Sequence, residues 1–380
     1  MDKIKCSYFK RKILSLLPEL NLLNLIKYNN NLKRLMSINL MNYKDYNENY
    51  STIKYIIKIH PDYYMDYIKK YPKEKNHIIQ SGKVSIKFRD TSYEILHLFM
   101  QNPSIEELTF TQFLRNNITT MQDMFSGCKN LKKINFYSFN SENVTSMYNM
   151  FGDCNELKEI NGLGNFNTKN VNEMGFMFMC CKSLEKLNLN SFDTSQVTGM
   201  NCMFTHCTSL TELNINNFNT ENVLSMESMF YNCKSLPFLN LNNFITKNVF
   251  NMGFMFYHCK SLQSVLIDNF NIEKVELMDN MFSDCISLTT LNLNSFQNTE
   301  HLISTERCFY NCHNLRKIEF KNFNFNLSIP NTNNMFSNCE SLTNIDIKKF
   351  KHIPNNQIKK MFYKSNNNLV EKLYLQKIFK

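Results

Sequence analysis

Residues 197–218 read VTGMNCMFTHCTSLTELNINNF, and this stretch holds one complete copy of the pattern that decides the fold. Val197, Met200 and Met203 recur at helical spacing, which places them on one face of a helical turn. Leu213 and Ile215 enclose Asn214, and such alternation of apolar and polar residues is typical of a short strand. One copy therefore predicts a helical turn followed by a strand.

The same pattern recurs along most of the chain with a period of 26 or 27 residues. Its most regular feature is a Phe followed three residues later by a Cys, as in Phe125/Cys128, Phe151/Cys154, Phe178/Cys181, Phe204/Cys207, Phe230/Cys233, Phe256/Cys259, Phe282/Cys285, Phe309/Cys312 and Phe336/Cys339. Degenerate copies flank the array at Phe99 and Phe362. A period this short leaves no room for a hairpin, so it predicts one parallel strand per coil of a leucine-rich-repeat solenoid.

The spacing Met-x-x-Met-Phe occurs seven times between Met121 and Phe282 and resembles the BspA-like leucine-rich repeats. The resemblance covers residues 96 to 380. It implies a right-handed solenoid that recognises other proteins, and family members with export signals act as surface adhesins. Three copies are one residue longer, those that hold Gly162, His301 and Pro330, and we expect bulges or loosened turns there.

The fold class is thus α/β, a leucine-rich-repeat solenoid with one short parallel strand plus a helical turn per coil. We expect two regions: about eleven coils over residues 96–380, and a basic, mainly helical region over residues 1–95 that caps the open end. Apolar residues at helical spacing between Ile13 and Ile26 predict two short helices. Val84, Ile86 and Phe88 alternate like a strand, which we expect to cover the N-terminal edge of the array.

The N-terminal region also allows a second interpretation, as an adaptor. It resembles an F-box in the residues Leu17, Pro18, Glu19, Leu20, Leu23, Ile26, Leu32 and Leu35. This resemblance implies a substrate adaptor of a ubiquitin ligase. The region carries 18 Lys and Arg against 9 Asp and Glu, most of the net charge of +10. Because these basic residues are dispersed, they indicate a solvated face rather than contact with nucleic acid or an anionic membrane.

The 13 cysteines predict a reduced, buried ladder. Nine fall on one repeat position, and the others are Cys6, Cys180, Cys202 and Cys308. Stacked strands lie about 4.8 Å apart, so a disulfide ladder is sterically conceivable. The odd number on the ladder and the preference of free Cys for buried positions oppose it. Cysteine and histidine spacings match no zinc motif, so we expect no metal and no cofactor.

No catalytic residue can be assigned from the sequence. The eight histidines are scattered, and a Gly-rich phosphate loop, G-x-S-x-G and H-E-x-x-H are all missing. We therefore expect a non-enzymatic protein without a small-molecule substrate. No apolar run reaches the length of a transmembrane helix, and polar residues interrupt the stretch from Ile13 to Ile26 that a signal peptide would need. These features favour a cytoplasmic or otherwise intracellular protein, and a surface adhesin would need an unrecognised export route.

The residues on either side of each strand's central position predict the chemistry of the concave face. Most are Asn and Thr, which suit a protein or peptide partner better than nucleic acid, because phosphate recognition needs clustered Lys or Arg. The candidate partner-binding residues are Tyr137, Asn214, Phe238, Asn240, Leu266, Asn292 and Lys317.

Phe238 and Leu266 break the polar rule in neighbouring coils. Exposed together, they would form an apolar anchor for a partner. The alternatives are that they pack on each other, or that the strand frame is off by one residue at this coil. For the Asn residues, the alternative to partner binding is a set of side-chain hydrogen bonds along the stack.

Overall fold

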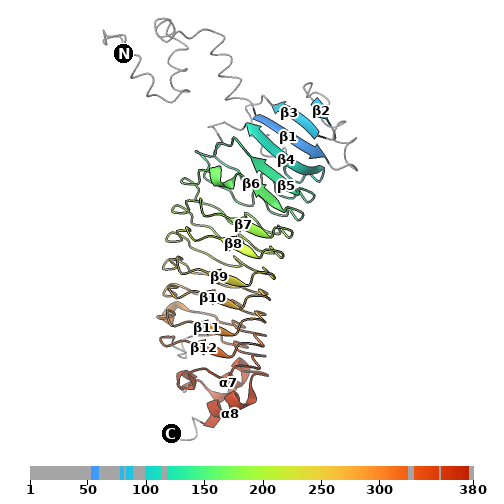
Figure 1. Cartoon of the computed structure of the whole chain (residues 1–380). Coiled ribbons are helices and arrows are strands. Elements are labelled where there is room, and N and C mark those ends of the chain that lie inside the picture. Colours follow the sequence, from blue (N-terminus) through green and yellow to red (C-terminus); the bar gives the residue numbers. More distant parts are fainter. Residues whose placement is uncertain are drawn as a thin grey trace, which may run out of the picture.

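The computed structural model describes residues 53–59, 78–80, 83–88, 99–112, 118–323, 329–350 and 352–375. The coils stack one upon another into an elongated parallel solenoid (Figure 1). Its strands are β4 (Ile105–Gln112), β5 (Lys133–Phe136), β6 (Glu159–Asn161), β7 (Lys186–Asn188), β8 (Glu212–Asn214), β9 (Phe238–Asn240), β10 (Ser264–Leu266), β11 (Thr290–Asn292) and β12 (Lys317–Glu319). The predicted solenoid with one short strand per coil is confirmed.

Strands of successive coils pair in parallel, with equivalent repeat positions side by side. Strands β4, β5 and β6 form one ladder, and β7 with β8, β9 with β10 and β11 with β12 form three more. In the pair β7 and β8, Leu187 lies opposite Leu213. A period of 26 residues keeps this register from coil to coil, so identical side chains stack along the axis.

The methionine half of each repeat differs in detail from the expected helical turn. It consists of tight turns: the Met203 N–H donates to the carbonyl oxygen of Met200, and the Cys207 N–H donates to that of Phe204. Between these turn ends, Cys202 and His206 have φ values of 56° and 61°. A hydrogen bond from the first to the fourth residue with positive φ at the third describes a type II turn. Two successive turns reproduce the spacing that a helix would give.

These turns also bond from coil to coil, as strands do. The N–H groups of Cys202, Phe204 and His206 donate to carbonyl oxygens of the next coil at 2.9, 2.9 and 2.7 Å. Parallel bridges continue this second ladder from Thr120 to Asn331. The backbone groups of the turns are therefore satisfied between coils, which is what allows a buried, non-helical segment.

Stacked phenylalanines fill the core. The rings of Phe178 and Phe204 lie 5.9 Å apart with an interplanar angle of 4°, and those of Phe204 and Phe230 lie 5.6 Å apart at 11°. A second column runs near the end of each strand segment, for example Phe218 on Phe244 at 6.5 Å. Each ring is covered by its neighbours, so the core belongs to the stack and not to single coils.

Buried threonines join the coils at the corner after the strand. The Thr220 side-chain oxygen accepts from the Ile245 N–H at 2.8 Å and donates to the Ile245 carbonyl oxygen at 3.0 Å. Thr168, Thr194 and Thr246 repeat this exchange with the coil that follows each of them. Each of these hydroxyls therefore both donates and accepts a hydrogen bond.

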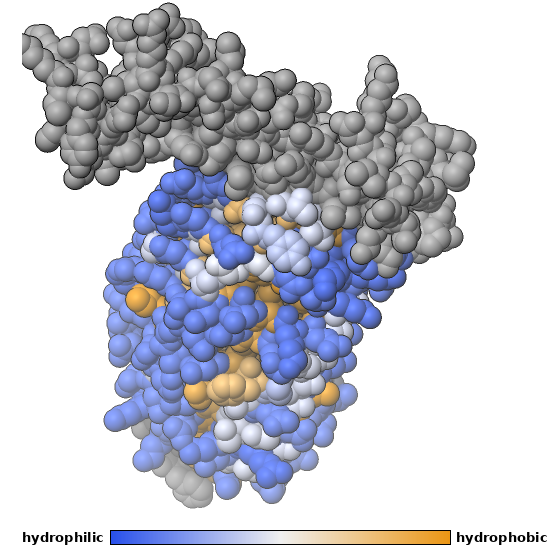
Figure 2. Space-filling model, turned by 45° about the horizontal axis from the view of Figure 1, so that its top comes forward, coloured by the Kyte–Doolittle hydropathy of each residue, from blue (hydrophilic) through white to orange (hydrophobic). Residues whose placement is uncertain are grey.

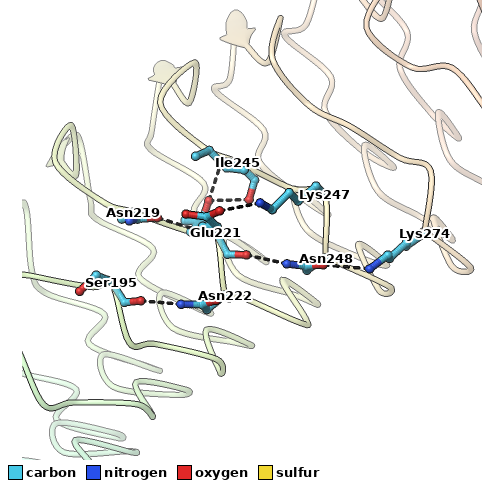
Figure 3. Close-up of polar contacts among 9 residues, drawn as sticks. Ser195, Asn219, Glu221, Asn222, Ile245, Lys247, Asn248 and Lys274 are labelled. Atoms are coloured by element: carbon cyan, nitrogen blue, oxygen red, sulfur yellow. Dashed lines mark hydrogen bonds and ion pairs between the residues drawn. The ribbon is translucent and has the colours of Figure 1, made fainter.

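Asparagine side chains bind the coil before them. The Nδ2 group of Asn222 donates to the Ser195 carbonyl oxygen at 2.7 Å, and that of Asn248 to the Glu221 carbonyl oxygen at 2.9 Å (Figure 3). Lys247 and Glu221 form an ion pair at 2.5 Å beside them. Much of the Asn in the repeats therefore serves the stack itself.

The longer coils behave as expected where they are described. Gly162 and Asn298 adopt left-handed conformations, and short 3-10 turns η2 (Leu163–Asn165) and η3 (Thr299–His301) follow them. At Gly162, an added Cβ would lie 2.2 Å from the Phe136 carbonyl oxygen, so only glycine fits. The third long copy falls partly outside the described residues.

At the N-terminal end, the sheet continues through three antiparallel strands. The order is β2 (Ile78–Gln80), β3 (Lys83–Phe88), β1 (Ile53–Ile59) and then β4. The predicted strand around Ile86 is confirmed as β3, but the prediction that it covers the edge of the array is wrong. Strand β1 pairs with β4, and β3 pairs with β1. The predicted helices between Ile13 and Ile26 and the F-box-like residues lie outside the described residues.

The C-terminal end is covered by helices α7 (Asn355–Met361) and α8 (Asn367–Leu375). Phe362 stacks on Phe336 at 4.9 Å, and Leu369 and Leu373 are buried. The degenerate last copy thus acts as the atypical terminal repeat that a solenoid needs. A further 3-10 turn, η4 (Ile347–Phe350), leads into this cap.

Candidate functional site

The strand face is the surface on which the sequence predicts binding. In β9, Phe238 and Asn240 are exposed while Leu239 between them is buried. The Phe238 side chain is 48% exposed and that of Leu266 is 37% exposed. Both therefore lie on the surface, and the strand frame holds at this coil. Phe238 lies opposite Ser264, and Leu266 lies opposite Asn240, so the two apolar side chains are diagonal neighbours and not a facing pair.

Charges along the first strand position alternate and neutralise one another. Lys133 binds Glu159 at 2.8 Å, and Lys186 binds Glu212 at 2.5 Å. The hydrogen bond with Lys133 is the main cause that lowers the pKa of Glu159. In the next three coils this position holds Phe238, Ser264 and Thr290. The paired charges thus end where the apolar side chains begin.

The predicted asparagines are oriented by their own backbone. The Oδ1 atom of Asn240 accepts from the Asn242 N–H at 3.1 Å, and that of Asn214 accepts from the Asn216 N–H at 3.4 Å. These Asx turns end the strands. These bonds are local. The alternative of side-chain bonds along the stack holds only for Asn292 among these three asparagines, whose Nδ2 group donates to Asp268 at 2.7 Å.

A hollow on the strand face ends at Phe238. It has a volume of about 1070 Å³ and is lined by parts of β6, β7, β8 and the start of β9, with Asn188, Leu213 and Asn214 among the lining residues. Figure 2 shows an apolar stripe on the molecular surface between hydrophilic flanks. A lining that mixes apolar side chains with amide groups is a typical surface for a polypeptide partner.

The seven predicted residues do not form one site. Asn214, Phe238, Asn240 and Leu266 lie on the adjacent strands β8, β9 and β10. Tyr137, which is 68% exposed, follows β5, and Lys317 lies in β12, where it forms an ion pair with Glu319. Asn292 in β11 is adjacent to the central group.

A second exposed apolar row was missed by the sequence reasoning. Leu224 and Phe250 lie in adjacent coils and are 47% and 44% exposed, and Ile303 is 48% exposed. The Phe250 N–H donates to the Leu224 carbonyl oxygen, which fixes the two residues side by side. Each of the three directly follows the buried Val or Leu of its repeat, so the signal was an apolar residue at a position that is Thr or Asn in earlier copies.

Burial disfavours the thiolate form of the ladder cysteines. Burial raises the pKa of Cys259 to about 12 and that of Cys128 to about 12. Cys180, which is half-buried, has its pKa raised to about 11 by burial and by Asp153. Within the described ranges no group of three His, Cys, Asp or Glu residues is arranged to hold a metal ion. Over the same part of the chain, no helix has the length and apolar character to cross a bilayer.

The stacked parallel strands give this protein the fold of a leucine-rich-repeat type solenoid. The chain belongs to the family described as "Mycoplasma protein of unknown function, DUF285", which matches residues 93–186, 155–264, 235–328 and 292–372. No curated protein sequence matches the chain. The family description gives no function, so function has to be argued from the surface.

The solved structures similar to this chain include three bacterial leucine-rich repeat proteins. A leucine rich cell surface protein from Faecalibacterium prausnitzii is 15% identical over 70% of this chain and 78% of that one, with a TM-score of 0.34. A leucine rich repeat protein of T. pallidum is 14% identical over 73% and 98% of the two chains, with a TM-score of 0.28. One from Eubacterium ventriosum is 16% identical over 63% and 91%, with a TM-score of 0.25.

Proposed function

We propose that this protein is a non-enzymatic scaffold that binds a protein or peptide through the strand face around β9 and β10. The observation that carries the proposal is the exposure of Phe238 on a strand position that is polar or charged in the other coils. A phenylalanine that is 48% exposed leaves much of its apolar surface in contact with water. Aromatic anchors surrounded by polar groups are the usual energetic centres of protein interfaces.

The surroundings of Phe238 support a polypeptide partner. The adjacent hollow supplies apolar side chains such as Leu213, and the amide groups of Asn188 and Asn214 line it as well. The nearest charged strand residues, Lys186 and Glu212, form an ion pair with each other. An uncharged peptide segment can therefore bind beside them without leaving a charge buried and unpaired. Leu266 extends the apolar surface into the next coil.

The test is a selection of random peptides on immobilised full-length protein, followed by affinity measurement for the selected sequences. We expect apolar or aromatic peptides that bind the wild type and lose at least tenfold in affinity on the double variant Phe238→Ser, Leu266→Ser. The matched control is Leu224→Ser, Phe250→Ser, because it removes the same two side-chain types at similar exposure from another surface. Peptides that respond equally to both variants, or that respond to neither, would contradict the proposal.

A further inference from the structure

A row of basic side chains follows the corner where the turns of each coil lead into the strand segment. Lys182, Lys234 and Lys260 each come directly after a ladder cysteine and are exposed. His206 and His258 come directly before one and are partly exposed. These five residues belong to four consecutive coils, and we call them the basic ridge.

The three lysines of the basic ridge carry uncompensated charge. Among the described residues no acidic side chain forms an ion pair with any of them, whereas Lys186 and Lys247 each contact a Glu one coil away. Their positive charge also acts on a ridge histidine. Burial is the largest cause that lowers the pKa of His206, and Lys182 and Lys234 lower it further. Like charges held close together without a counterion indicate a surface for an anionic partner.

Acidic residues bound the basic ridge at both ends. Asp153 occupies the coil before it, and Asp284 occupies the coil after it, 3.3 Å from the Nε2 atom of His258. Burial is the main cause that lowers the pKa of His258, and Lys260 and Lys234 lower it further. Asp284 raises the pKa and so acts in the opposite direction. The unbalanced charge is therefore confined to a stretch of about 15 to 20 Å, at roughly 4.8 Å per coil.

A column of aromatic rings supports the ridge from within. His206 packs on Tyr231 at 5.1 Å, Tyr231 on Tyr257 at 5.0 Å, and Tyr257 on His258 at 4.2 Å. The Nδ1 atom of His206 accepts from the Asn232 amide at 2.6 Å, so a neutral ring carries its proton on Nε2. The lysine ammonium groups and this Nε2–H are all hydrogen-bond donors.

We propose that the basic ridge binds an extended peptide segment rich in Asp and Glu, at a site separate from Phe238. Lys182 and Lys234 are two coils apart, about 10 Å, which corresponds to roughly three residues of an extended chain. Charges at this interval suit carboxylates distributed along a peptide. They do not converge on a single phosphate, and the ridge has no Arg to form the bidentate contacts that phosphate groups favour. Nucleic-acid binding depends mainly on contacts from Lys and Arg to many phosphates, and the ridge offers only three lysines.

The experiment measures fluorescence anisotropy of a labelled peptide of alternating Asp and Glu on the full-length protein, at low and at physiological salt. The test variant is the triple substitution Lys182→Gln, Lys234→Gln, Lys260→Gln. The matched control is Lys158→Gln, Lys169→Gln, Lys321→Gln, which removes the same charge from exposed lysines that also form no ion pair among the described residues. We expect the ridge variant to lose at least tenfold in affinity and the control less than twofold.

Further arms distinguish the partner classes. An Asn/Gln peptide of equal length should not bind, and single-stranded DNA and inorganic polyphosphate should bind more weakly than the acidic peptide at equal charge. Equal losses in both triple variants, no binding of the acidic peptide, or tighter binding of polyphosphate or DNA would each overturn the proposal. As a second readout, bound peptide should shift the His206 ring signals in NMR spectra of the wild type. The Phe238→Ser, Leu266→Ser variant should bind the acidic peptide like the wild type, so this result is independent of the function proposed above.

Discussion

The thiol of Cys207 donates a hydrogen bond to the backbone carbonyl oxygen of Phe178 in the preceding coil, with 3.1 Å between sulfur and oxygen. The same carbonyl oxygen accepts the N–H of Cys181, which closes the turn of its own coil at 3.2 Å. The thiol of each ladder cysteine thus donates the second hydrogen bond that a buried carbonyl oxygen can accept. The bond recurs at all nine ladder cysteines, and Ser365 makes it in the last coil.

This geometry predicts that the donor at position 207 matters more than the sulfur atom. Cys207→Ala removes the donor and should lower the free energy of unfolding by about 1 to 2 kcal/mol, the usual range for a lost buried hydrogen bond. Cys207→Ser keeps a donor, as Ser365 does, and should lose less. Urea denaturation of both variants and the wild type measures the difference. An alanine variant as stable as the serine variant would show that the hydrogen bond contributes nothing.

The same bonds require reduced thiols, which gives a second prediction. In the native protein the buried ladder should react slowly with a thiol reagent at neutral pH, because burial raises the thiol pKa, as at Cys339, where it reaches about 12. After denaturation without reductant, close to 13 thiols should react, the number in the sequence. Four or fewer would mean that disulfides join the coils and that the protein resides in an oxidising compartment.

The solenoid could be predicted because its signal repeats. One coil such as residues 197–218 is ambiguous, but a Phe that recurs with a period of 26 or 27 residues fixes the stacking and the register together. The exposure of Phe238 followed from the same frame, because alternate strand positions point to opposite faces.

The turns could not be predicted from periodicity. Met200 and Met203 are spaced as in a helix, and a pair of type II turns produces the same spacing. The distinguishing feature is positive φ at Cys202, His206 and the equivalent positions. In the described coils Gly127 holds one of them, while most others hold Asn, Asp, Cys, His, Ser or Phe, so no repeated glycine marked the turns. Strand β1 was missed for a different reason: its pairing with β4 depends on a tertiary contact across some fifty residues.

The positive φ values predict a stabilising substitution. Ser228 has φ of 56°, a conformation that costs an L-residue about 1 to 2 kcal/mol and costs glycine little. Glycine also loses more freedom on folding, so Ser228→Gly should stabilise by a net amount of about 0.5 kcal/mol. Ser209 has no positive φ, and Ser209→Gly should therefore destabilise. Denaturation midpoints of the two variants should lie on opposite sides of the wild type, and a lower midpoint for Ser228→Gly would contradict the strain argument.

The aromatic column predicts a large cost for removing one ring. Phe204 is fully buried between Phe178 and Phe230. Phe204→Ala leaves a cavity that the two neighbouring coils cannot close, since their backbone ladders hold them apart, and should cost about 3 to 5 kcal/mol. Phe204→Leu should cost clearly less. Calorimetry or urea unfolding provides the comparison, and a loss below 1 kcal/mol for the alanine variant would show that the coils can collapse onto the missing ring.

The histidines of the basic ridge predict how stability depends on pH. The pKa of His206 is lowered, first by burial and then by Lys182, Lys234 and His258. The unfolded chain, where a histidine titrates near pH 6.5, therefore binds the proton more readily than the folded chain. Stability from this residue is present above about pH 6.5 and is lost as the pH falls through the lower, folded value. Urea midpoints measured from about pH 7.5 to 5.5 should fall less steeply in His206→Gln than in the wild type. By NMR titration, the pKa of His206 should rise toward 6.5 in the double variant Lys182→Gln, Lys234→Gln. A folded His206 that titrates above 6.5 would reverse the sign and refute the prediction.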